Sequence, residues 1–285
     1  PTPDNKQNYR ISKNTILAKG THSTVYKGTD TRSGKQLAFK LFNLSKLPCV
    51  AKRQYQQETH ILQKLQHLPS TPKLLDVLER GSEVCYVMPL IQGKNMKYML
   101  KKHPNGIPDN VAAFLFKAIL TAVQQIHSSG VCHLNLSLDN LIFDTTTSSI
   151  KVIGFQFAKE TRITWQGVSV PVFQQDFCGS VPYVAPEVIN KEEYDGTKVD
   201  IWAIGVIFYA LCFNRLPFND YENNADAIFK KISNIAVYYP PNLCPKLCSL
   251  FSSIFVSDPM ARPSASELLD HPFFFCTRKY TAPWI

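Results

Sequence analysis

The stretch HLNLSLDN, residues 133 to 140, places a histidine, two asparagines and a serine among leucines. It lies between a predicted helix and a polar turn, TTTSS at residues 145 to 149, which joins two short predicted strands. Asn135 and Asn140 carry amides, and an amide cannot accept a proton near neutral pH. The stretch therefore offers several hydrogen-bonding groups but has no general base at Asn135.

Length and composition fit a folded protein made of one large domain or two small lobes. Of the 285 residues, 45% are hydrophobic and 19% are charged, which excludes an intrinsically disordered chain. The apolar runs are shorter than the roughly 18 residues of a membrane helix, and the opening PTPDNKQNYR has no signal-peptide core. We therefore expect no membrane span, and the abrupt start suggests a domain taken from a longer protein.

The chain is basic, with 31 Lys and Arg against 22 Asp and Glu and a formal charge of +9. The positive charges are spread along the sequence, and the longest basic run is a pair such as Lys101-Lys102. This pattern favours a solvated surface over a nucleic-acid patch. We expect no nucleic-acid partner.

Eight cysteines occur singly or as Cys244-x-x-x-Cys248, without a CxxC pair or a histidine at zinc-binding spacing. This usage predicts free thiols and no metal site. It fits a reduced compartment, and we expect an intracellular, cytoplasmic protein.

The first third of the chain has the alternation typical of strands. Residues 14 to 43 alternate apolar and polar side chains between turns, which predicts three antiparallel strands. A helical apolar stripe follows over 53–68, and two more strands are predicted over 73–79 and 83–90. This segment is expected to form a small, mostly β lobe.

Helical periodicity predominates after Gly93. The predicted helices cover 109–127, 197–212, 223–234, 245–256 and 264–270. The predicted domains are an N-terminal extension over 1–13, an N-lobe over 14–92 and a C-lobe over 93–285, the two lobes forming one domain.

Short motifs follow one another in a fixed order and spacing. They are LAKGTHSTVYKG (17–28), LAFK (37–40), Glu58, HLNLSLDN (133–140), IGFQFA (153–158), VAPE (184–187) and DIWAIG (200–205). Together they resemble the eukaryotic protein-kinase domain over residues 14 to about 275, although one such motif alone would be a weak signal. RLPF at 215–218 and DHPFF at 270–274 are similar to the calmodulin-dependent and related serine/threonine kinases.

The resemblance implies a bilobal α+β fold. A small, mostly antiparallel β N-lobe with one helix is expected to precede a larger, mostly α C-lobe. It also implies that Glu187 pairs with Arg262, and that Leu62, Leu74, His133 and Phe155 form the apolar stack of the family.

The resemblance further implies that a nucleotide site is partly kept. Lys40 and Glu58 match the ion pair that positions the phosphates of ATP, whereas Ala18 replaces a glycine of the phosphate loop and Gly20 remains. The candidate nucleotide-binding residues are Ala18, Gly20, Val25, Ala38, Lys40, Glu58, Met88, Ile91, Asn140 and Ile142. Two alternatives stay open: weak binding of ATP or ADP without a metal, and no nucleotide binding.

Three residues that carry the chemistry of the family are replaced. Asn135 stands for the catalytic aspartate, Ser137 for the lysine that steadies the phosphoryl group, and Gly154 for the aspartate that binds Mg²⁺. We therefore predict no catalytic residue, no metal site and no required cofactor.

These losses lead us to expect a pseudokinase. Such a protein would have no enzyme activity and would act as a scaffold or allosteric regulator of a signalling partner, either an active kinase or its substrate. The alternative is a serine/threonine protein kinase with weak, unconventional ATP-dependent phosphotransfer, which the survival of Lys40, Glu58 and Asn140 supports.

Overall fold

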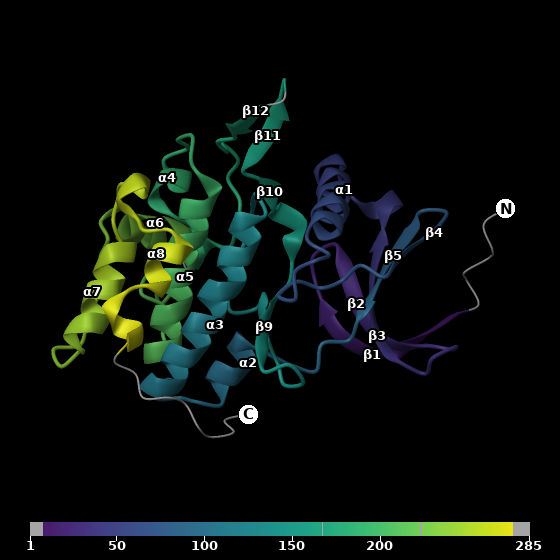
Figure 1. The fold of residues 1–285 in the computed structure, drawn as a ribbon, viewed down its shortest axis with the longest axis horizontal. Coiled ribbons are helices and arrows are strands. Elements are labelled where there is room, and N and C mark those ends of the chain that lie inside the picture. The colour runs from purple at the N-terminus through teal and green to yellow at the C-terminus, as the bar shows by residue number, and fades with distance from the viewer. Residues whose placement is uncertain (1–7, 167, 223, 276–285) are drawn as a thin grey trace. The chain divides into compact units, whose positions relative to one another are not determined.

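The structure is a computed structural model that describes residues 8–166, 168–222 and 224–275. Its backbone divides into two compact units, Pro1–Gln92 and Gly93–Ile285. The first unit, purple to blue in Figure 1, is mostly β-sheet with one α-helix, and the second, blue to yellow, is mostly helical. The α+β fold predicted from the sequence is thereby confirmed.

The first unit contains an antiparallel sheet with strand order β1-β2-β3-β5-β4. Its strands are β1 (Tyr9–Lys19), β2 (Ser23–Asp30), β3 (Gln36–Asn43), β4 (Asp76–Arg80) and β5 (Glu83–Pro89). β1 begins inside the extension predicted over residues 1–13. Tyr9 and Ile11 pack on the buried side chains of Leu37, Phe39 and Val87, so residues 9–13 belong to the sheet.

Helix α1 (Cys49–Lys64) starts and ends about one turn earlier than the helix predicted over 53–68. Pro48 occupies its N-cap position, where a missing backbone N–H leaves no donor unsatisfied. The helix buries Glu58, Ile61 and Leu62. One carboxylate thus lies on the same helix face as the apolar residues.

Helix α5 (Gly196–Phe213) forms the centre of the second unit. It is apolar on all sides and buried along almost its whole length, as expected of a helix surrounded by protein. The side chain of Asp195 caps its start, and Asn214 ends it in the left-handed conformation. Gly196 is required, because a Cβ there would lie 2.4 Å from the Cys132 sulfur.

The remaining helices pack in the same unit and agree with the predicted ranges to within about two residues where helices were predicted. They are α2 (Met96–Lys101), α3 (Asp109–Ser128), α4 (Pro186–Ile189), α6 (Ala225–Ser233), α7 (Pro245–Ile254) and α8 (Ala265–Leu269). The periodicity did not predict α2 and α4, which are short.

Small sheets support the loops of the second unit. β6 (Gly93–Asn95), β8 (Leu141–Asp144) and β9 (Ser149–Val152) form one sheet, and β7 (Val131–Cys132) pairs with β10 (Lys159–Glu160). β11 (Arg162–Trp165) and β12 (Val168–Pro171) form a hairpin that the sequence patterns missed. The figure shows this hairpin projecting from its unit (Figure 1).

Two segments of the described chain, Asn110–Ser128 and Gly196–Phe213, are long and apolar enough to cross a membrane by length and composition alone. Core helices pass the same test, and 56% and 78% of these segments are buried inside the protein. They are weak signals of a membrane span.

Candidate active site

Lys40 and Glu58 form a buried ion pair in the first unit. The Lys40 Nζ lies 2.7 Å from both carboxylate oxygens of Glu58. The side chains are only 15% and 3% exposed, and Nζ also lies 5.0 Å from the centroid of the Phe42 ring. Burial and the Glu58 charge raise the pKa of the neighbouring Tyr86. The pair is therefore held in a desolvated setting, where its electrostatic effect is strong.

The strand register places most predicted binding residues on one face of the sheet. Residues directly opposite each other in an antiparallel sheet share a face. Ala18 is opposite Val25 and Val25 is opposite Lys40, which gives one row across β1, β2 and β3. Two residues before Lys40, Ala38 faces the same way and is opposite Met88.

The two loop residues of this set flank the sheet. Gly20 closes the turn between β1 and β2, with its N–H donating to the Ser23 carbonyl at 2.8 Å. Ile91 follows β5. Lys40 and Glu58 are thus joined by direct contact, and six further candidates lie on the same sheet or at its margins.

In the second unit, the buried carboxylate of Asp200 on α5 holds the loop 133–140 by hydrogen bonds. Asp200 accepts hydrogen bonds from the backbone N–H groups of His133 and Leu134 at 2.7 and 2.8 Å. The His127 ring lies 2.9 Å from the same carboxylate. Leu134 has a φ of 59°, an unfavourable value for a leucine, so the Asp200 bonds hold a strained backbone.

Asp200 is the site residue that the sequence reasoning missed. DIWAIG was assigned to the helix that anchors the large lobe, but no link from its aspartate to the 133–140 loop was predicted. The available signal was an aspartate within an otherwise apolar helix, since a buried carboxylate requires hydrogen-bond donors.

Side chains of the loop are held by further hydrogen bonds. The His133 ring contacts the Ile153 carbonyl at 2.9 Å and meets the Phe155 ring edge to face, with centroids 4.8 Å apart. The Asn140 amide donates to the Asn135 carbonyl at 2.8 Å. The Ser180 hydroxyl donates to the Asn135 side-chain oxygen at 3.3 Å. Asn135 thus receives a hydroxyl proton in a hydrogen bond, although it cannot remove it.

Ser137 and Ile142 make contacts that belong to the loop and to a small sheet. Ser137 is buried, and its carbonyl accepts the Asn140 N–H at 3.1 Å. Ile142 is opposite Lys151 and Asn95 in the β6-β8-β9 sheet. Of the two candidates in this unit, Asn140 is the last residue of the loop that carries Asn135, and Ile142 lies in strand β8.

Gly154 has no side chain that could bind magnesium. Gly154 has a φ of 83°, which favours glycine, and a Cβ there would lie 2.7 Å from the Asn140 Oδ1. Mg²⁺ prefers anionic oxygen ligands in octahedral geometry, whereas Asn140 offers one neutral oxygen. The residues present therefore do not fit the Mg²⁺ that the kinase fold implies.

Replacing Gly154 by aspartate is expected to destabilise the protein by about 1–3 kcal/mol without creating a metal site. The new Cβ would displace the Asn140 side chain and break its bond to Asn135. Urea unfolding with and without Mg²⁺ measures both effects. Gly34→Asp is the control, because Gly34 has a φ of 69° but nothing within 4 Å of its Cβ. A Gly154→Asp variant that Mg²⁺ stabilises would contradict the prediction.

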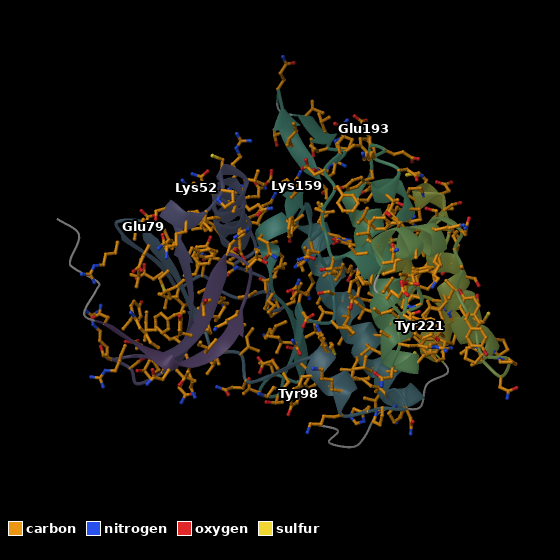
Figure 2. All side chains as sticks on the ribbon, turned by 180° about the vertical axis from the view of Figure 1, so that it is seen from behind. Lys52, Glu79, Tyr98, Lys159, Glu193 and Tyr221 are labelled. Atoms are coloured by element: carbon orange, nitrogen blue, oxygen red, sulfur yellow. The ribbon has the colours of Figure 1, made fainter. Side chains whose placement is uncertain are left out.

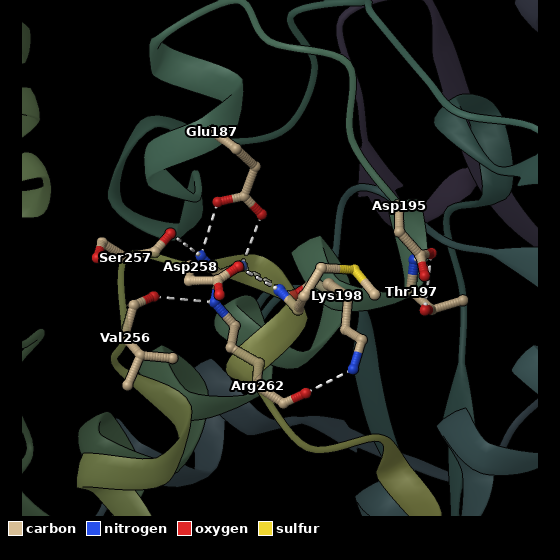
Figure 3. A network of polar contacts seen from close by, with 9 residues as sticks. Glu187, Asp195, Thr197, Lys198, Val256, Ser257, Asp258 and Arg262 are labelled. Atoms are coloured by element: carbon tan, nitrogen blue, oxygen red, sulfur yellow. Dashed lines mark hydrogen bonds and ion pairs between the residues drawn. The ribbon is translucent and has the colours of Figure 1, made fainter.

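A second buried ion pair joins Glu187 of α4 to Arg262. The guanidinium donates to the two carboxylate oxygens at 2.6 and 2.7 Å, and both side chains are almost completely buried (Figure 3). Arg262 also donates to the Val256 carbonyl at 3.2 Å and lies over the Trp202 ring. The pairing expected from the resemblance is present in the structure.

The family comparison agrees with this geometry. The model of the protein kinase domain matches residues 11–274, which is most of the chain. The chain belongs to the protein kinase domain family. The resemblance drawn from the motifs is therefore confirmed.

Among the curated relatives of this protein kinase domain are protein kinases of two plants and of Dictyostelium discoideum. CBL-interacting serine/threonine-protein kinase 5 of Arabidopsis thaliana is 30% identical over 272 residues, covering 94% of this chain and 58% of the relative. CBL-interacting protein kinase 10 of Oryza sativa subsp. japonica is 28% identical, covering 93% and 56%. A probable serine/threonine-protein kinase of Dictyostelium discoideum is 28% identical, covering 90% and 30%. The chain spans about half the length, or less, of these relatives.

The comparisons contradict the expected pseudokinase without enzyme activity. The relatives are named as protein kinases, several as serine/threonine kinases, so they point to an enzyme. The prediction was wrong because it overestimated the effect of losing the catalytic aspartate on the rate. Loss of a general base removes on the order of 10²- to 10⁴-fold of the rate, which slows a reaction without abolishing it. The replacements at Asn135, Ser137 and Gly154 therefore did not warrant a prediction of inactivity.

Proposed function

We propose that this protein kinase domain is a serine/threonine kinase that transfers the γ-phosphoryl group of ATP slowly and without a conventional base. The observation that carries the proposal is the buried Lys40–Glu58 pair, with both carboxylate oxygens 2.7 Å from Nζ. An ammonium ion held in this way can bind phosphate oxygens, because its position and charge are fixed before the nucleotide arrives. The serine/threonine kinases among the relatives support the same reaction class.

The chemistry can proceed without an aspartate at position 135. In the phosphoryl-transfer step a serine or threonine oxygen forms a bond to the γ-phosphorus while the bond to the ADP oxygen breaks. The transition state is largely dissociative, so the hydroxyl proton can leave late, to water or to a phosphoryl oxygen. The Asn135 amide oxygen, which accepts the Ser180 hydroxyl in this structure, can orient an acceptor hydroxyl.

The nucleotide is proposed to act without a bridging metal. Gly154 and Asn140 do not supply the anionic oxygen ligands that Mg²⁺ requires. We therefore expect the negative charge of the phosphates to be balanced by protein groups such as the Lys40 ammonium. ATP is the proposed phosphoryl donor, and ADP is expected to bind at the same place.

A protein substrate is the proposed partner, in keeping with the serine/threonine class. The names of several relatives describe an interaction with CBL, but the chain spans only part of those proteins, and the portion it spans is the kinase domain. We propose a protein hydroxyl as acceptor and an intracellular site of action.

Removing the Lys40–Glu58 pair is expected to lower phosphotransfer by about 100-fold. The double variant Lys40→Met/Glu58→Leu serves best, because Lys40→Met alone would leave a buried carboxylate unpaired and destabilise the fold. The measurement is incorporation of phosphate from radiolabelled ATP into a serine-rich protein, with Mg²⁺, with Mn²⁺ and with EDTA.

Lys35→Met is the matched control, since Lys35 is an exposed lysine just before β3. The control should keep its activity, and the wild type should keep most of its activity in EDTA. Incorporation no higher than that of the double variant under every condition would reject the proposed function.

A further inference from the structure

The segment formed by β6 and α2 exposes a cluster of positive charge. From Gly93 to Pro108 the sequence contains four lysines and no acidic residue. Helix α2 buries Met96, Met99 and Leu100, and its lysines face the solvent. The cationic face comprises Lys94, Lys97, Lys101 and Lys102 around the exposed ring of Tyr98, which Figure 2 labels at the margin of the molecule.

Helix stability accounts for only part of this charge. Lys101 ends α2 and Lys102 is its C-cap residue, where the helix dipole favours cations. Lys94 and Lys97 lie at the N-terminal end of α2, where the helix dipole disfavours cations. Lys97 and Lys101 are four residues apart, and like charges at that spacing repel each other. Asp139 accepts Lys97 at 2.9 Å, but among the described residues no ion pair with a carboxylate is found for Lys94, Lys101 or Lys102. The stability of α2 therefore does not account for all four lysines.

The Tyr98 ring holds two of the lysines together. The Nζ atoms of Lys94 and Lys102 lie 5.4 and 5.7 Å from the ring centroid, within the range of cation–π attraction. Because both lysines contact the same ring, Lys94, Tyr98 and Lys102 form one stripe. The exposed ring is 45% accessible, and two ammonium groups on it create a compact site of positive potential.

The cationic face is joined to the loop that carries Asn135 and Asn140 through Lys97 and Asn95. The Lys97 N–H donates to the Leu138 carbonyl at 3.2 Å, and the Lys97 ammonium and the Asn95 amide both contact the Asp139 carboxylate. Asn95 in β6 is also opposite Ile142 in β8. A ligand bound on the cationic face at Lys97 would therefore lie beside the loop proposed to orient the acceptor hydroxyl.

We propose that the cationic face of β6 and α2 binds an acidic segment of the protein substrate. This inference rests on the proposed function, because it assigns the substrate class of the same site. Charge complementarity favours carboxylates, and the contact with the loop favours a polypeptide whose serine or threonine reaches Asn135. A lipid surface is less favoured, since the apolar residues of α2 are buried and only Tyr98 could insert.

The test uses the whole chain and a fluorescently labelled peptide with one serine flanked by glutamates. Binding is measured by fluorescence anisotropy without ATP, at low salt and at 0.15 M salt. The variant Lys94→Glu/Lys102→Glu is expected to bind roughly tenfold more weakly or worse, and binding should weaken as salt rises. Lys94→Gln/Lys102→Gln should fall between the variant and the wild type.

The matched control is Lys35→Glu/Lys52→Glu, which changes the net charge equally through exposed lysines of the first unit. An equal loss of binding in the control would overturn the inference, as would tighter binding of a serine–lysine peptide, of phosphatidylserine vesicles or of single-stranded RNA. Phosphorylation of the acidic peptide is measured separately. Selective binding without phosphorylation would reject the proposed function and leave the cationic face as a docking surface for acidic polypeptides.

Discussion

Replacing Arg262 by methionine is expected to lower the free energy of unfolding by about 3–5 kcal/mol. The substitution removes both hydrogen bonds to Glu187 and the bond to the Val256 carbonyl, while a carboxylate that is only 2% exposed stays in place without its counterion. An uncompensated buried charge is among the most destabilising defects in a protein core. Urea unfolding followed by tryptophan fluorescence measures the loss.

A double-mutant cycle separates the lost pair from the lost packing of Arg262 on Trp202. The variant Glu187→Gln/Arg262→Met has no buried charge at this place, so it should be less destabilised than Arg262→Met alone. Arg53→Ala, an exposed position on α1, should change stability by less than about 0.5 kcal/mol. A loss below about 1 kcal/mol for Arg262→Met would show that the carboxylate is protonated or reaches water.

The fold and the two buried ion pairs could be predicted because they depend on residue types at fixed spacing. Lys40 and Glu58 match the strand lysine and the helix glutamate of the kinase motifs, and charged residues as buried as these are found paired. The same holds for Glu187 and Arg262. A motif therefore fixes these contacts even across 75 residues of sequence.

The residues that organise the 133–140 loop could not be predicted in the same way. Asp200 acts through backbone N–H groups, which every residue possesses, so no side-chain pattern in the loop identifies it. The role of Gly154 also depends on a backbone angle. Its sequence suggested only a lost aspartate, whereas the structure shows a φ of 83° and a place where a Cβ would meet the Asn140 side chain.

The hairpin of β11 and β12 was missed for a different reason. Ile163 is opposite Val170, so these two apolar residues share one face only when the strands are paired in this register. Each strand has four residues, too few to show alternation convincingly in the sequence. The sequence likewise showed Lys94 and Lys102 only as scattered charges. That both contact the Tyr98 ring is visible only in three dimensions.

Replacing Asp200 by alanine is expected to be as disruptive as the loss of Arg262, but its effect should concentrate in the active-site loop. Hydrogen bonds to a charged acceptor contribute about 1.5–3 kcal/mol each, and Asp200 accepts one from His133 and one from Leu134. Their loss gives about 3–6 kcal/mol. Asp258→Ala is the control, because Asp258 caps a short helix at the surface through one backbone N–H.

Hydrogen exchange distinguishes loosening of the loop from general loss of stability. In the wild type the N–H groups of His133 and Leu134 are buried and bonded, so they should exchange slowly, and Asp200→Ala should accelerate them more than the amides of α1. Without Asp200 nothing offsets the strain at Leu134, whose φ of 59° should relax and move Asn135 with it. Phosphotransfer should then fall further than stability alone explains. Unchanged exchange at these two amides would show that the loop holds its shape without Asp200, and that Asn135 owes its position to Asn140 and Ser180.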